Sequence, residues 1–342
     1  MQETALRNKQ WIYRKRPVGR VSHEHYELAE NSLAPDIADN EVLVQSRYIS
    51  VDPYMRIQQA ERNSWEEPHP LDIVQRAGVI AQVVESRSSK VAPGDWVLTY
   101  SGWQLFAKCH QSEIQKIDPN AAPVTTALGV LGMPGRTAWF GLMEVGQPKP
   151  GETVVVSGAG GAVGSLVAQF AKRAGCRVFG IAGGPDKCKY LRDSLHLDGS
   201  IDYRAFSTTA ALSEEILKQT AGVDVYFDNV GGRITDAVIP QIKLRARIVI
   251  CGSISQYDGA LDAPELGPRF LHHLLFQRAR VQGILARDYT HRMDEMLAIV
   301  APWVKRGEIV FPETIVDGFE QLPDALNSLF EGKNLGKLLV RV

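Results

Sequence analysis

A β-branched run meets a glycine-rich turn in Val154-Val155-Val156-Ser157-Gly158-Ala159-Gly160-Gly161-Ala162-Val163-Gly164. Residues 165–174 continue with a helical pattern, and glycine recurs at positions 158, 161 and 164. A dinucleotide pyrophosphate needs backbone N–H donors at a helix N-terminus, and it needs glycines so that the chain can approach it closely. A glycine-rich loop between a strand and a helix supplies both features. The stretch therefore predicts a dinucleotide-binding turn, with a purely structural turn as the alternative.

The chain beyond this turn alternates between short apolar runs and amphipathic stretches. Four- to eight-residue β-branched runs that alternate with helices indicate βαβ units in a parallel sheet covered on both faces. Six such runs match a doubly wound nucleotide-binding domain. The predicted strands are 153–157, 176–182, 200–203, 223–229, 246–251 and 280–285, and predicted helices include 162–174, 186–194 and 207–220.

The first part of the chain has a different pattern, with strands separated by Pro, Gly and Ser turns. The expected strands are 41–52, 75–86, 95–99 and 113–118. After residue 307 we expect a strand at 314–316, a helix at 319–330 and a last strand at 337–342 that closes back onto the first domain. The fold class predicted is α/β in two domains: residues 1–130 with 307–342 form a mainly β domain, and residues 131–306 form the nucleotide-binding domain.

The second strand of the nucleotide-binding domain indicates which cofactor binds. An NAD site usually has Asp or Glu at the end of this strand, about twenty residues after the glycines. Here the strand ends Gly180-Ile181-Ala182-Gly183-Gly184, without an acid, and Lys187 follows, although Asp186 lies beside it. A lysine can make a charge-assisted hydrogen bond with a 2′-phosphate. NADP(H) is therefore the predicted cofactor, and an ordinary surface lysine is the alternative.

Metal ligands are not expected from this sequence. The chain has no cysteine before Cys109, and no CxxC pair among its four cysteines. Cys109-His110 lacks further partners at ligand spacing, and His272-His273 lies in an apolar helical stretch that favours packing. We therefore predict no metal site.

Composition excludes several classes of protein. The 342 residues are 44% hydrophobic and 23% charged, and 38 basic residues against 39 acidic residues give a net charge of −1. This balance gives no electrostatic basis for binding nucleic acid or an anionic membrane. The scattered cysteines and the absence of an apolar signal core near the N-terminus favour the cytoplasm. The basic residues among the first twenty are expected to be a solvated edge, with an anion-attracting arm as the alternative.

An ordered set of motifs resembles a known family along nearly the whole chain. The chain resembles the zinc-independent medium-chain dehydrogenase/reductases of the prostaglandin reductase (leukotriene B4 12-hydroxydehydrogenase) group. Within this group it is most similar to the bacterial curcumin-reductase-like and plant alkenal double-bond reductase members. The motifs are Arg16-Pro17-Val18-Gly19, Ser50-Val51-Asp52-Pro53-Tyr54-Met55-Arg56, Gly132-Met133-Pro134-Gly135-Arg136-Thr137-Ala138, the glycine-rich turn, Phe227-Asp228-Asn229-Val230-Gly231-Gly232, Cys251-Gly252-Ser253-Ile254-Ser255-Gln256-Tyr257 and Gly332-Lys333-Asn334-Leu335-Gly336-Lys337.

The resemblance implies a GroES-like catalytic domain, a Rossmann domain, NADPH, a homodimer and reduction of the C=C bond of α,β-unsaturated ketones or aldehydes. It departs from the usual pattern at Arg136 and Trp139, where the group usually has an apolar residue and Tyr. Substrate preference is therefore not carried over. The resemblance implies cofactor contacts from Gly160, Gly161, Ala162, Val163, Gly164, Lys187, Tyr203, Asn229, Cys251, Gly252, Ser253, Ile254, Ser255, Tyr257, Gly283, Ile284, Leu285 and Asn334.

Reduction of an enone without a metal requires hydrogen-bond donors. Hydride addition to the β-carbon moves negative charge onto the carbonyl oxygen, and a tyrosine can stabilise the resulting enolate. Tyr54 and Tyr257 are the candidate donors, and a packed core tyrosine is the alternative at each position. Two other functions remain open: an NADPH:quinone oxidoreductase of the zeta-crystallin type, and a non-catalytic NADPH-binding protein with a structural or redox-sensing role.

Overall fold

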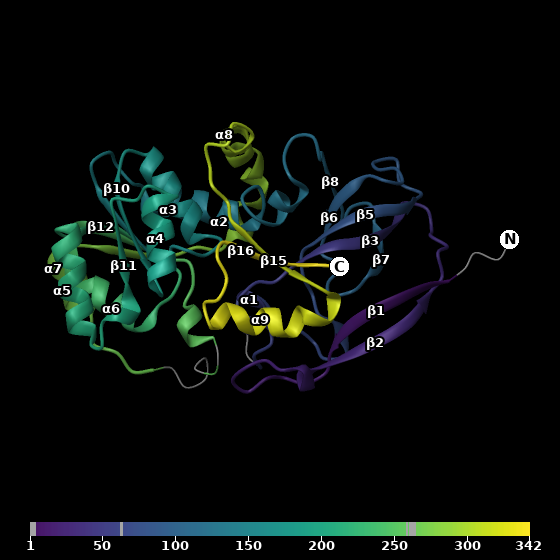
Figure 1. Ribbon diagram of the computed structural model, residues 1–342, viewed down its shortest axis with the longest axis horizontal. Helices are drawn as coiled ribbons and strands as arrows, with labels where there is room; N and C mark the ends of the chain where they lie inside the picture. Colours follow the sequence, from purple (N-terminus) through teal and green to yellow (C-terminus); the bar gives the residue numbers. More distant parts are fainter. Residues whose placement is uncertain (1–4, 62–63, 258, 260–264) are drawn as a thin grey trace. The chain divides into compact units, whose positions relative to one another are not determined.

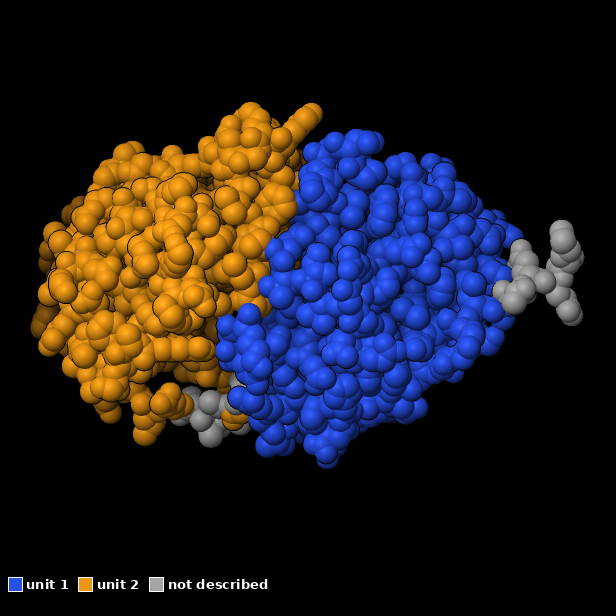
Figure 2. Space-filling view, viewed as in Figure 1, with its two compact units in different colours: residues 1–128, 313–333, 338–342 blue, residues 129–312, 334–337 orange. Residues whose placement is uncertain are grey.

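The computed structural model describes residues 5–61, 64–257, 259 and 265–342. The chain forms two compact units, which Figure 2 shows in different colours. Unit 1 comprises residues 1–128, 313–333 and 338–342, and unit 2 comprises residues 129–312 and 334–337.

Unit 2 is built around a six-stranded parallel sheet with the order β11-β10-β9-β12-β13-β14. Numbered along the sheet-forming segment, this order is 3-2-1-4-5-6, which is the doubly wound order of dinucleotide-binding domains. The β-branched residues of the central strand β9 are all buried, as expected for a parallel sheet covered on both faces. The strands are β9 (Thr153–Ser157), β10 (Arg177–Ala182), β11 (Gly199–Asp202), β12 (Val223–Asp228), β13 (Ile242–Ile250) and β14 (Arg280–Gly283).

Helices connect these strands (Figure 1). Helix α3 packs against β9 and β10, and α4 packs against β10 and β11. Local signals fix both ends of α5: the Thr208 side chain accepts a hydrogen bond from the Ala211 backbone N–H, and Ala221 ends the helix in a left-handed conformation. The helices of unit 2 are α2 (Met133–Phe140), α3 (Gly164–Arg173), α4 (Pro185–Asp193), α5 (Thr209–Thr220), α6 (Gly232–Val238), α7 (Leu271–Gln277) and α8 (Met293–Lys305).

Unit 1 is mainly β, as predicted. Its larger sheet has the order β15-β16-β3-β5-β6-β8, with β7 also paired to β3, and a smaller sheet has the order β2-β1-β4. The last strand, β16, pairs antiparallel with β3, so the chain terminus completes the sheet of the N-terminal part. The elements are β1 (Leu6–Tyr13), β2 (Tyr26–Leu33), β3 (Glu41–Ser50), α1 (Tyr54–Gln58), β4 (Ile73–Val74), β5 (Val79–Ser86), β6 (Trp96–Thr99), β7 (Phe106–His110), β8 (Gln115–Ile117), β15 (Glu313–Asp317), α9 (Leu322–Phe330) and β16 (Lys337–Arg341).

The bounds of the compact units differ from the predicted domain ranges in three places. Residues 129–130, 307–312 and 334–337, predicted to lie in the first domain, belong to unit 2. The last two segments have an observed cause. The physical reason is pairing with the glycine-rich turn and α3: Gly161 and Gly336 form a parallel bridge, and the Val310 backbone N–H donates to Gln169 Oε1 at 2.8 Å.

The basic N-terminal segment forms ion pairs within unit 1. Arg7 pairs with Glu30, Lys9 with Glu320, and Arg20 with Glu331. Arg14 pairs with both Glu27 and Asp72. These pairs favour the interpretation of a solvated edge over an anion-attracting arm.

Candidate cofactor and active site

The glycine-rich turn has the geometry that its spacing predicts. Gly158 follows β9 with a left-handed φ of +59°, a conformation that glycine adopts without strain. A Cβ on Gly164, the first residue of α3, would lie 2.3 Å from the Gly158 carbonyl oxygen. Only glycine fits there, and the close approach directs the helix N-terminus toward the end of the strand, where a pyrophosphate would bind.

The turn brings together predicted cofactor residues that are distant in sequence. The Gly336 backbone N–H donates to the Gly160 carbonyl at 2.8 Å, and Asn334 Nδ2 donates to the Gly336 carbonyl at 2.9 Å. A Cβ on Gly160 would lie 3.3 Å from Lys187 Cδ. The predicted contacts Gly160, Lys187 and Asn334 therefore lie around one turn within unit 2.

A second basic residue accompanies Lys187. Burial lowers the pKa of Lys187 from its ordinary value, and the charge of Arg204 lowers that pKa further. The Arg204 guanidinium lies over the Tyr203 ring, 5.8 Å from its centroid. A Cβ on Gly183 would lie 2.8 Å from Arg204 Nε and 2.9 Å from Tyr203 Cε1, so glycine lets both side chains pack over the end of β10. These two cations suit a bound 2′-phosphate.

Sequence reasoning missed Arg204. The available signal was a basic residue directly after Tyr203, at the end of the third strand of the sheet. Its relevance depends on β11 lying beside β10, which places the two strand ends at one edge.

Two loops with further predicted contacts lie side by side at the carboxyl edge of the sheet. The loop after β12 begins with Asn229, and the loop after β13 contains Cys251–Tyr257. Asn229 Nδ2 donates to the Ser157 carbonyl at 2.7 Å, and the Ile254 backbone N–H donates to the Asn229 carbonyl at 3.3 Å. Ligands of open parallel sheets bind outside this edge.

The end of β14 adjoins these loops. Gly283 is paired with Ile250 at the end of β13, and the Ile284 backbone N–H donates to the Ile250 carbonyl at 3.0 Å. Ile284 is buried, whereas Leu285 is partly exposed. The predicted contacts Gly283, Ile284 and Leu285 thus lie on the same sheet edge as the loop after β13.

The two candidate tyrosines belong to different units. Tyr257 is 7% exposed, and its hydroxyl oxygen accepts a hydrogen bond from the Ser253 backbone N–H at 2.9 Å, a bond that does not use the hydroxyl proton. Burial raises the pKa of Tyr257, so the phenol is protonated at neutral pH. Tyr54 is the first residue of α1 in unit 1, and burial followed by the charge of Asp52 raises its pKa well above the ordinary value. Both side chains can therefore act as donors.

Potential metal ligands are dispersed. Among residues 5–61, 64–257, 259 and 265–342, no group of three or more His, Cys, Asp or Glu side chains could hold a metal ion. Cys109 is buried in β7 while the adjacent His110 is exposed, as alternation along a strand requires. The His272 and His273 rings lie 4.0 Å apart on α7. All four cysteines are free thiols.

One of the two departures from the usual family pattern has a clear packing role. Trp139 in α2 contacts Phe170 of α3 and Trp303 of α8, with ring centroids 5.5 and 6.0 Å apart. Trp139 therefore holds three helices of unit 2 together. Arg136 lies in the same helix, half buried.

In the described part of the chain, no helix has the length and apolar character needed to span a membrane. Residues 153–171 contain no charged side chain, and they form a strand, a turn and most of α3.

Two family models and several curated proteins match this chain. Residues 9–117 match the family described as N-terminal domain of oxidoreductase, and residues 162–302 match the family described as zinc-binding dehydrogenase. The NADPH-dependent curcumin reductase of Escherichia coli is 39% identical over 100% of this chain and 99% of its own length. The NADP⁺-dependent 2-alkenal reductase of Nicotiana tabacum is 38% identical over 98% of this chain and 97% of its own length.

A solved structure extends the similarity to the fold. CurA from Vibrio vulnificus in complex with NADPH has a TM-score of 0.89 and 41% identity, covering 98% of this chain and 99% of that chain. Whole-length identity to relatives named as reductases, together with the doubly wound unit and the mainly β unit, shows the family. The chain belongs to the zinc-independent medium-chain dehydrogenase/reductases, in the group that includes prostaglandin reductase 1, 2-alkenal reductase and curcumin reductase.

Proposed function

We propose that this protein catalyses the NADPH-dependent reduction of the C=C bond of α,β-unsaturated ketones and aldehydes. The observation that carries the proposal is its whole-length similarity to relatives named for this chemistry, a curcumin reductase and a 2-alkenal reductase. Fold alone would not suffice, because one fold can support many functions.

The residues of unit 2 fit NADPH. The close approach at Gly164 accommodates a pyrophosphate, and Lys187 and Arg204 supply two positive charges beside Tyr203 for the 2′-phosphate. The cofactor is NADP(H), and when bound it supplies the hydride. Further contacts are assigned to Gly160, Gly161, Ala162, Val163, Gly164, Asn229, Cys251, Gly252, Ser253, Ile254, Ser255, Gly283, Ile284, Leu285 and Asn334.

The catalytic contribution of the protein is stabilisation of negative charge. Addition of hydride to the β-carbon of the substrate moves an electron pair onto the carbonyl oxygen and forms an enolate. A buried hydroxyl donor is worth roughly 10²–10³-fold in rate at such an oxygen. We assign this role to Tyr257 and name Tyr54 of the mainly β unit as the second donor. The α-carbon then takes a proton, which completes the saturated carbonyl product.

The test is a spectrophotometric assay of NADPH oxidation with an enal, an enone and a quinone. The proposal predicts turnover of the enal and the enone. Turnover of the quinone alone would instead support a quinone oxidoreductase, and NADPH binding without turnover would support a non-catalytic protein.

We also propose that the protein is a cytoplasmic homodimer that pairs through unit 2. Strand β14 ends the sheet, with β13 as its neighbour among the described strands, and all four of its residues are exposed. On the preceding helix α7, Leu271 and Leu275 are each 71% exposed and Phe276 is 66% exposed. An apolar face beside an open sheet edge suits association with a second copy. Sedimentation analysis should show a dimer that the substitution Phe276→Asp weakens, whereas Leu217→Asp on α5 does not.

A further inference from the structure

Asp228 is a buried carboxylate at the carboxyl end of β12. The residue is 2% exposed, and its strand lies between β9 and β13 in the centre of the sheet. An ionised carboxylate in such a place is tolerated only when hydrogen bonds replace its lost water. The partners of Asp228 therefore indicate which groups this charge organises.

The carboxylate accepts five hydrogen bonds from its surroundings. Oδ1 accepts from Ser157 Oγ at 2.8 Å, Tyr226 OH at 2.9 Å, the Val230 backbone N–H at 3.0 Å and the Gly231 backbone N–H at 2.9 Å. Oδ2 accepts from Thr235 Oγ1 of helix α6. One side chain thus joins the end of β9, the loop after β12 and the helix that follows.

The backbone carbonyl of Asp228 holds the neighbouring loop. It accepts from the Cys251 N–H at 2.8 Å and from the Gly252 N–H at 3.1 Å. The two loops are joined further by Ser255 Oγ, which donates to the Val230 carbonyl at 2.7 Å. A Cβ on Gly231 would lie 3.0 Å from Ser253 Cβ, so glycine allows this close approach. Asp228 therefore contacts both loops that carry assigned cofactor contacts.

The carboxylate also orients Asn229 through Ser157. Ser157 Oγ donates to Asp228 Oδ1 and accepts from the Asn229 backbone N–H at 2.9 Å. Asn229 Nδ2 then donates to the Ser157 carbonyl, which fixes the side-chain amide. The position of the Asn229 amide thus depends on a network centred on Asp228.

We propose that Asp228 is a positioning residue that shapes the carboxyl edge of β12 and β13 for the nicotinamide half of NADPH. This inference rests on the proposed function, in that NADPH is the ligand of unit 2. Asp228 acts through Asn229 and the loop Cys251–Tyr257. The adenosine half is held separately, by the groups that follow β10 and β11.

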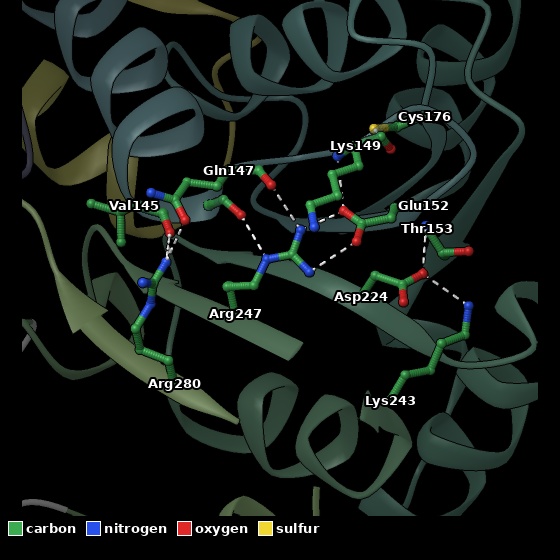
Figure 3. Close-up of polar contacts among 11 residues, drawn as sticks. Val145, Gln147, Lys149, Glu152, Thr153, Cys176, Asp224, Lys243, Arg247 and Arg280 are labelled. Atoms are coloured by element: carbon green, nitrogen blue, oxygen red, sulfur yellow. Dashed lines mark hydrogen bonds and ion pairs between the residues drawn. The ribbon is translucent and has the colours of Figure 1, made fainter. Parts of the chain in front are cut away.

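The same strand supplies a matched control. Asp224 of β12 accepts from the Thr153 backbone N–H at 2.8 Å and from Lys243 Nζ at 2.9 Å (Figure 3). Strand geometry places Asp224 roughly 13 Å from Asp228, at the opposite end of the strand. Asp224→Asn changes a carboxylate of the same strand without changing either cofactor loop.

The experiment compares Asp228→Asn with Asp224→Asn in the full chain. NADPH affinity is measured by fluorescence titration, and affinity for 2′,5′-ADP, which represents the adenosine half alone, by calorimetry. We expect Asp228→Asn to weaken NADPH binding about tenfold or more, because the amide group of Asn has a donor NH₂ in place of one acceptor oxygen of the carboxylate. It should leave 2′,5′-ADP binding within about twofold, and Asp224→Asn should leave both affinities unchanged.

Two results would overturn the inference: unchanged NADPH affinity in a folded Asp228→Asn protein, or equal weakening of NADPH and 2′,5′-ADP. If Asp228→Asn does not fold, Thr235→Val removes one hydrogen-bond donor to the carboxylate and retains the carboxylate itself. This variant should weaken NADPH binding without weakening 2′,5′-ADP binding, by a smaller factor than Asp228→Asn. An NADPH affinity equal to that of the wild-type protein would reject the inference. The proposed function fails differently, when the wild-type protein binds NADPH yet reduces no enone. Wild-type protein that binds no NADPH would reject both.

Discussion

At the scale of single residues, electrostatics distinguishes the 2′-phosphate side of the proposed cofactor site. Lys187 is half buried, and the charge of Arg204 adds to the cost of keeping its ammonium group protonated. A bound phosphate would offset this cost for Lys187. The 2′-phosphate of NADPH supplies that negative charge and NADH does not, so this side of the site should favour NADPH over NADH.

The first prediction concerns that advantage. Lys187→Ala should raise the dissociation constant for NADPH by about 10- to 150-fold, since a charge-assisted hydrogen bond contributes about 1.5–3 kcal/mol. The dissociation constant for NADH should change little. Fluorescence titration with both cofactors measures the two effects, and equal losses would indicate a folding defect or a wrong assignment.

The second prediction is a pH dependence of the same contact. The pKa of Lys187 is lowered, so the charged fraction in the free protein falls, and the NADPH dissociation constant rises, at a pH below the ordinary lysine value of 10.5. Lys187→Arg keeps the charge at alkaline pH and should remove this rise. Titrations with NADH serve as the control for other alkaline effects. An identical alkaline profile in wild type and Lys187→Arg would contradict the assignment.

The third prediction concerns Tyr257. The substitution Tyr257→Phe retains the buried ring but removes the hydroxyl, so turnover of enones should fall by roughly one to three orders of magnitude while NADPH affinity stays nearly unchanged. Steady-state kinetics and a binding titration separate the two quantities. Wild-type turnover in this variant would transfer the donor role to Tyr54. A loss of NADPH affinity would instead make Tyr257 a cofactor contact without a catalytic role.

At the scale of elements, the sequence predicts best where local pattern and burial agree. The β-branched strands of the parallel sheet are confirmed, although β13 begins four residues earlier than predicted. The hairpin of β1 and β2 was missed, because β2 is mostly exposed and its polar side chains give no apolar alternation. Helix α2, β4 and β7 were likewise not predicted.

In the candidate site, too, some features follow from local sequence pattern and others do not. The strand–turn–helix geometry follows from glycine spacing, and the structure has it. The proximity of Arg204 to Lys187, and the hydrogen bond between Ser253 N–H and the Tyr257 hydroxyl, depend on packing between elements. Sequence spacing carries no information about such contacts.

The fourth prediction tests the close approach in the glycine-rich turn. Gly164→Ala places a Cβ against the Gly158 carbonyl oxygen, and such overpacking should lower the free energy of unfolding by about 1–3 kcal/mol. The same change should weaken NADPH binding. Gly161→Ala is the comparison, because its Cβ would lie 3.3 Å from the Gly158 carbonyl oxygen and the φ of Gly161 is not left-handed. Urea-induced unfolding measures both variants. Equal destabilisation of the two would show that the helix does not depend on this contact.

At the scale of the whole molecule, the two units have separate chemical roles in the proposed function. Unit 2 carries the cofactor groups and the donor Tyr257, and the mainly β unit carries Tyr54. The chain crosses between the units four times, and its last strand pairs with β3 of the N-terminal part. A truncated chain lacking residues 313–342 would lose the pairing of β16 with β3, and β3 would keep only β5 and β7 as partner strands.

Product analysis after incubation of the purified protein with NADPH and an enone tests reduction of the C=C bond itself. We expect NADPH to be oxidised in a one-to-one ratio with formation of the saturated ketone, with the carbonyl group retained, and an enal to behave likewise. Deuteride from labelled NADPH should appear on the β-carbon. Formation of the allylic alcohol, or NADPH oxidation with a quinone and with neither enone nor enal, would show that the protein is not an enone C=C reductase.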